Sequence, residues 1–134
     1  MGIWMVGQNI YEDPNSTTGF KGKGNYVGIE LCSNDTTLVE GDYYFSDSGD
    51  PMTWYEGEFG YPYDWTNATG DWEWLKDGVI NVAKQNGVYT FTFILTSESN
   101  NTVEGQYTGT VIPSYSPIIS SLRGVHRTTP FNRF

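Results

Sequence analysis

The chain of 134 residues has a single cysteine, Cys32, and a single histidine, His126. One cysteine excludes an intramolecular disulfide framework. Zinc sites need several histidine or cysteine ligands, and this chain does not offer them. A Ser-His-acid triad would need His126, near the end of the chain, to lie inside the folded core. We therefore expect no bound metal, no cofactor and no histidine-based catalysis.

Charge is also scarce, and it is unevenly distributed. Charged residues make up 17% of the chain and the net charge is −9. Residues 24–75 contain no lysine or arginine, whereas residues 113–134 contain three arginines and no acid. An acidic surface repels phosphate backbones, and no apolar run approaches the roughly 18 residues of a membrane span, so we expect neither nucleic-acid binding nor a span. The acids of the middle region are Glu30, Asp35, Glu40, Asp42, Asp47, Asp50, Glu56, Glu58, Asp64, Asp71 and Glu73.

Aromatic residues and glycines are abundant instead, and the chain alternates with a period of two. Aromatic residues make up 16% of the chain, and there are 16 glycines. Asn86-Gly87 separates two strand-like runs and is typical of a type I′ hairpin turn. Short alternating runs bounded by turn residues predict one all-β domain over residues 1–112, a small antiparallel β-barrel or β-sandwich. The expected strands cover residues 24–33, 41–46, 53–61, 71–75, 78–84, 88–96 and 102–112.

The alternation also predicts which side chains share a face. It places Trp54, Glu56 and Glu58 on one face of their strand, and it places Trp72 and Trp74 together, as core or sheet-packing residues. A turn is expected at residues 76–78, and residues 11–24 are expected to form a loop. The thiol of Cys32 is expected to be buried and inert.

The last 22 residues change in composition. Ser116, Pro117 and Gly124 fit the cap, first turn and end of a short helix, so residues 113–134 are expected to form a helix or an extended tail. The tail ends in two rings and two cations that suit docking onto an acidic surface, either of this domain or of a second protein or copy. The expected docking residues are Arg127, Phe131, Arg133 and Phe134.

Five segments together resemble a known type of protein: residues 24–31 (GNYVGIEL), 38–43 (LVEGDY), 78–82 (GVINV), 86–96 (NGVYTFTFILT) and 103–110 (VEGQYTGT). Their rhythm resembles that of small, uncharacterised lipocalin-like β-barrel surface lipoproteins of gut Bacteroidetes. The resemblance implies a lipocalin-like barrel at an extracellular or cell-surface location. Residues 1–7 have neither a basic segment nor a long apolar segment, and no lipidated cysteine is present, so the chain as given is not expected to carry a secretory signal.

An aromatic segment is the strongest candidate for binding. Flat rings cover the apolar faces of sugars, and neighbouring carboxylates accept hydrogen bonds from hydroxyl groups. We therefore expect a non-enzymatic module that binds glycans or a small amphipathic ligand. The expected ligand-binding residues are Trp54, Tyr61, Tyr63, Asp64 and Trp65.

Two alternatives remain open from the sequence. One is a structural or accessory subunit, held in a larger assembly, including a phage or surface-lipoprotein complex, through residues 113–134. The other is a small hydrolase. Glu56 and Glu58 are spaced for acid–base work, although solvated carboxylates on an outward face are expected instead.

Overall fold

The computed structural model describes residues 2–33, 38–112 and 125–126, and all regular structure within them is β-strand. No helix in this part of the chain is therefore long and apolar enough to cross a membrane. The prediction of an all-β barrel or sandwich is confirmed, and the sheet has the shape of a barrel. The strands are β1 (Gly2–Val6), β2 (Ile10–Glu12), β3 (Phe20–Cys32), β4 (Gly41–Phe45), β5 (Thr53–Asp64), β6 (Thr69–Gln85), β7 (Val88–Ser97), β8 (Thr102–Gly109), β9 (Val111–Ile112) and β10 (Val125–His126).

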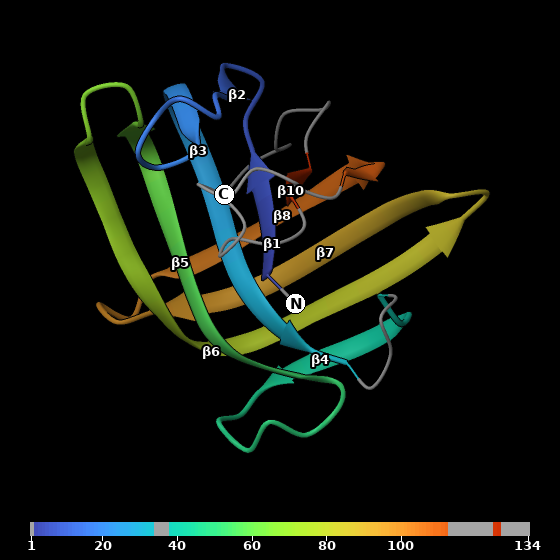
Figure 1. The fold of residues 1–134 in the computed structure, drawn as a ribbon. Helices are drawn as coiled ribbons and strands as arrows, with labels where there is room; N and C mark the ends of the chain where they lie inside the picture. Colours follow the sequence, from blue (N-terminus) through green and yellow to red (C-terminus); the bar gives the residue numbers. More distant parts are fainter. Residues whose placement is uncertain (1, 34–37, 113–124, 127–134) are drawn as a thin grey trace.

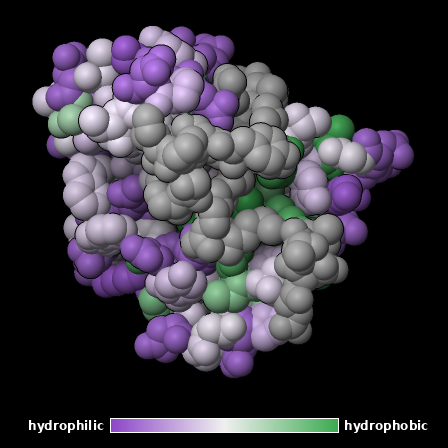
Figure 2. All heavy atoms as spheres, viewed as in Figure 1, coloured by the Kyte–Doolittle hydropathy of each residue, from purple (hydrophilic) through white to green (hydrophobic). Residues whose placement is uncertain are grey.

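The strands form one strongly curved sheet in the order β8-β7-β6-β4-β5-β3-β1-β10-β9, with β2 paired to β3 (Figure 1). The ends of this order, β8 and β9, follow one another in the chain, so the sheet curls into a nearly closed barrel. Most pairs are antiparallel, but β4 runs parallel to β5 and β1 parallel to β10. Figure 2 shows hydrophilic side chains around the periphery of the same view and hydrophobic ones toward its middle.

The hairpins follow the sequence pattern closely. Asn86 and Gly87 both have positive φ, 52° and 80°, as a type I′ turn requires. In β7, Phe91 and Phe93 are buried and Thr92 is exposed, and in β8 Val103 and Tyr107 are buried. In both strands large buried side chains alternate with more exposed ones, as the period of two in the sequence indicates.

Two predictions about strand boundaries are wrong. Residues 76–78 are not a turn, because β6 continues through them with a register irregularity between Leu75 and Asp77. The Asp77 carboxylate accepts the Gly78 amide at 2.8 Å, and Gly78 has a φ of 124°. The second error concerns residues 11–24, where β2 and the start of β3 form a short antiparallel pair in place of a loop.

Two separate hydrophobic cores hold the sheet. The larger fills the barrel, with Val27, Ile29 and Leu31 of β3 facing inward beside Trp54 and Tyr43. The smaller lies on the other face of β1 and β3, where β2 and the loop after β5 cover the sheet. Its members are Val6, Ile10, Phe20, Tyr26 and Trp65, with Trp4 and Tyr63 packed against them.

Several predictions for the end of the chain lie outside the described residues. These are the helix at residues 116–124 and the docking residues Arg127, Phe131, Arg133 and Phe134. Two residues of the predicted tail are described: Val125–His126 form β10, between β1 and β9. The sheet thus extends beyond the boundary at residue 112.

Candidate functional site

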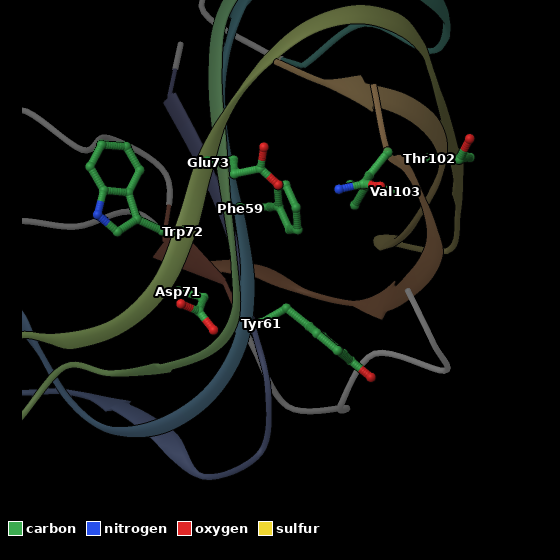
Figure 3. A pocket seen from close by; sticks show the side chains of 8 residues that line it. Phe59, Tyr61, Asp71, Trp72, Glu73, Thr102 and Val103 are labelled. Carbon is green, nitrogen blue, oxygen red and sulfur yellow. The ribbon is translucent and has the colours of Figure 1, made fainter. Parts of the chain in front are cut away.

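A cavity of about 380 Å³ opens where β5, β6 and the start of β8 meet. Phe59 and Tyr61 come from β5, Asp71 and Glu73 from β6, and Val103 from β8. Figure 3 shows Phe59, Glu73 and Val103 directed toward the same space, while the Trp72 ring lies on the other side of β6. We call this space the mouth cavity; Trp72, Asn101 and Thr102 complete its lining.

The mouth cavity combines apolar and polar groups. Phe59 is 9% and Val103 is 2% exposed, so they supply a buried apolar base. Tyr61 is 53% exposed and presents its ring at the opening. Such a mixture of aromatic surface and a few polar groups is typical of small-molecule pockets.

Glu73 is fixed at the wall of this cavity by the turn between β7 and β8. Its carboxylate accepts the backbone amide of Ser99 at 3.2 Å. Hydrogen bonding with the Ser99 side chain is the largest cause that lowers the pKa of Glu73 below its ordinary value. The group is thus a pre-oriented, ionised acceptor.

A second hollow, about 180 Å³, lies on the outer face of the sheet, and we call it the outer groove. Trp4, Gly28, Glu58 and Trp74 form one row across β1, β3, β5 and β6, because each is paired with the next. Glu30 and Glu56 are paired with one another in an adjacent row and also line the groove.

Glu58 is the most perturbed carboxyl in the outer groove. Burial is the main cause that raises its pKa to about 7, and the charge of Glu56 adds to the effect. A hydrogen bond with the Tyr26 side chain partly offsets the shift. Burial likewise raises the pKa of the Tyr26 phenol, so Tyr26 remains a hydrogen-bond donor.

The five predicted ligand-binding residues do not form one surface. Trp54 is fully buried, and its Nε1 donates to the carbonyl oxygen of Gly78 at 3.0 Å. Trp65 is 9% exposed and packs on Tyr26 in the smaller core, with a ring-centroid distance of 4.8 Å. The expectation that these two tryptophans present a contact surface is wrong, because the barrel and the smaller core each enclose one of them.

Tyr63 and Asp64 also have structural surroundings. Tyr63 is half-buried against Tyr26 and Trp65. Asp64 accepts the amides of Thr66 and Asn67 at 2.9 and 3.1 Å, and it organises the turn after β5. Of the five predicted residues, Tyr61 is the one that lines the mouth cavity.

The prediction that Trp72 and Trp74 are core residues is also wrong. They are 44% and 41% exposed, and their rings meet edge to face at 5.2 Å on the outside of β6. The alternation of the sequence correctly predicts that the two tryptophans share a face. It does not distinguish the inner face of the sheet from the outer one, on which they lie.

The sequence reasoning missed Asp71, Glu73 and Val103 at the mouth cavity, and Trp4 and Trp74 at the outer groove. The hairpin of β5 and β6 brings Glu73 beside Phe59 and Trp74 beside Glu58, whereas Val103 and Trp4 come from strands that are distant from this hairpin in the chain. In the part of the chain that the structure describes, no three His, Cys, Asp or Glu side chains are arranged to hold a metal ion. Comparison of the chain with protein-family models, curated proteins and solved structures found no match.

Proposed function

We propose that this protein is a non-enzymatic binding module that takes a glycan or another small amphipathic ligand into the mouth cavity. The observation that carries the proposal is the combination at one opening of the exposed Tyr61 ring, the oriented Glu73 carboxylate and the apolar base formed by Phe59 and Val103. A ligand with one apolar face and several hydroxyl groups meets these features together.

The chemistry of the cavity supports this ligand class. An exposed tyrosine ring covers the C–H face of a sugar at a low entropic cost. The carboxylates of Asp71 and Glu73 accept hydrogen bonds from hydroxyl groups, and the hydroxyl of Thr102 can donate one. The volume of about 380 Å³ falls within the usual range of ligand pockets, about 300–1,000 Å³.

The proposal places the module at a cell surface or outside the cell, on the strength of the composition and of the lipocalin-like resemblance. The alternative role, an accessory subunit held through residues 113–134, rests on side chains outside the described residues. It stays a prediction.

The test is a glycan array followed by calorimetry on any hit. Tyr61→Ala is expected to weaken binding about tenfold, because covering a half-exposed ring stabilises a complex by roughly 1–1.5 kcal/mol. Tyr44→Ala is the matched control, since Tyr44 is 55% exposed on β4 and does not line the cavity. An equal loss from both variants, or the absence of any hit for the parent protein, would refute the proposal.

A further inference from the structure

The outer groove lies on the opposite face of β5 and β6 from the mouth cavity, and its chemistry is different. Two indoles line it, Trp4 on β1 and Trp74 on β6, and the carboxylates of Glu30, Glu56 and Glu58 line it with them. From these surroundings we propose that the outer groove binds an organic cation, an alkylammonium or guanidinium group, between the two tryptophans.

The geometry of the row makes room for such a group. Trp4 and Trp74 are separated by β3 and β5, so their backbones stand about 14 Å apart at the usual strand spacing. Gly28, between them, has no side chain, and a Cβ there would lie 2.8 Å from two atoms of the Trp4 ring. The glycine therefore lets the Trp4 indole lie close against β3, over the Gly28 position, and the hollow of about 180 Å³ lies beside it.

The aromatic walls are held in place by their neighbours. The Trp4 ring is stacked on Tyr26 at 5.8 Å, and the Trp74 ring meets Trp72 edge to face at 5.2 Å. Cations are attracted to the faces of aromatic rings, tryptophan most strongly, and the attraction grows when water is excluded. Two fixed indoles at one hollow thus favour a cation that also has an apolar stem.

Carboxylates give the groove its preference for positive charge. Glu56 and Glu58 come from β5 and Glu30 from β3, and residues 24–75 contain no lysine or arginine. Glu58 is largely buried, and Tyr26 hydrogen-bonds to it. A cation in the groove would compensate the cost of ionising that buried carboxyl, which a neutral sugar would not do.

The affinity of the outer groove for a cation is expected to depend on pH, and the charged groups around Glu58 determine the direction of that dependence. The groups that face Glu58 are Tyr26 and Glu30 on β3 and Glu56 on its own strand, whereas the β1 and β6 neighbours, Trp4 and Trp74, carry no charge. Because the pKa of Glu58 is raised to about 7, a cation meets a largely protonated Glu58 at pH 6 and an ionised one at pH 8. Affinity for the cation is therefore expected to rise with pH across this interval.

The test uses n-butylammonium and n-butylguanidinium as probes, with n-butanol as a neutral analogue of similar length. Titration is followed by two-dimensional NMR of the ¹⁵N-labelled indole groups in the whole chain. The cations are expected to shift the signals of Trp4 and Trp74 but not that of the buried Trp54, and butanol is expected to shift none. Glu58→Gln is expected to weaken cation binding about tenfold, the value of one charge-assisted contact, and to abolish its rise between pH 6 and 8.

The control is Asp47→Asn, which removes one negative charge from the exposed turn after β4 and lies outside the lining of the groove. Equal shifts by butanol and butylammonium, or an equal loss of affinity in both variants, would overturn the proposal.

A lysine-containing tripeptide, with its alanine counterpart, distinguishes a partner's side chain from a free amine. Tighter binding of the peptide than of butylammonium assigns the groove to a protein partner, and tighter binding of the amine assigns it to a small metabolite. Failure of Tyr61→Ala to affect glycan binding bears on the mouth cavity alone.

Discussion

Replacing Glu58 with glutamine is expected to stabilise the protein above pH 7. It is also expected to reduce the change in unfolding free energy between pH 5 and 8. Glu58 sits on the outer face of β5, where burial and the charge of Glu56 raise its pKa from 4.5 to about 7. The folded protein therefore binds this proton more tightly than the unfolded chain. Between pH 4.5 and 7 each increase in pH favours unfolding.

The size of the effect follows from the shift. A difference of about 2.5 pKa units, at 1.36 kcal/mol per unit, corresponds to roughly 3 kcal/mol once the pH is well above 7. Glu58 keeps some contact with water, so about 2–3 kcal/mol is the expected value. This stability is fully present below pH 4.5 and is lost as the pH rises through 7. Glutamine has nearly the same shape as glutamate and cannot ionise, so the Glu58→Gln variant does not lose this stability as the pH rises.

The assay is urea unfolding followed by tryptophan fluorescence at pH 5, 6, 7 and 8. The difference in unfolding free energy between Glu58→Gln and the parent is expected to grow from pH 5 to pH 7 and to level off toward pH 8, with an unchanged dependence on urea. Glu98→Gln controls for the loss of one negative charge from an acidic protein. A constant difference across the four pH values would refute the reasoning, because it would show that Glu58 ionises without a folding cost.

Two further substitutions test the packing around the two sites. Trp54→Phe is expected to cost about 2–3 kcal/mol in urea unfolding, because it leaves a void in the barrel and deprives the Gly78 carbonyl of the indole donor at 3.0 Å, while butylammonium binding should persist. Gly28→Ala is expected to cost about 1–2 kcal/mol and to move the Trp4 indole signal, because the new Cβ would lie 2.8 Å from that ring. Gly24→Ala on the same strand is the control, since its Cβ would meet Ile10 at an ordinary 3.5 Å, and an equal cost for both alanines would contradict the clash.

The parts of the fold that could be predicted from the sequence are those in which paired strands follow one another in the chain. The Asn86-Gly87 turn fixes the pairing of β6 with β7, and alternation then gives the inward faces of β7 and β8. The continuity of β6 through residues 76–78 could not be predicted, because Lys-Asp-Gly suits a turn and an irregularity within a strand equally well. Only the pairing of β6 with β5 at one end and with β4 and β7 at the other keeps it extended.

The two sites were harder to predict than the strands because each is assembled across several strands. Tyr61 was recognisable as an aromatic residue beside a proline, and Glu73 lies near it because β5 and β6 form a hairpin, whereas Val103 joins them only through the curvature of the sheet. Trp4 joins Trp74 through a row across β1, β3, β5 and β6, of which β5 and β6 alone follow one another in the chain. Composition and spacing carry no information on such a row until the register is known.

The prediction that Trp54 is an exposed ligand-binding residue failed for a reason that can be traced in the sequence. Strict alternation puts Trp54, Glu56 and Glu58 on one face, so a buried Trp54 would take two carboxylates into the barrel, at a cost of several kcal/mol for each ion. The structure avoids this with an extra residue in β5. Leu31 pairs with Trp54 and Glu30 with Glu56, so Tyr55 has no partner on β3 and is 43% exposed. This bulge shifts the alternation by one residue.

The same bulge places Phe59 in the barrel and Glu56 and Glu58 in the outer groove. Both proposed sites therefore depend on one inserted residue. Regular alternation would put a large apolar ring and two acids on the same face of β5, so either the ring would be exposed or the carboxylates would be buried. A bulge between the ring and the acids lets the ring be buried without desolvating both carboxylates. Trp54 thus serves the barrel, and the carboxylates that follow it remain available at the surface.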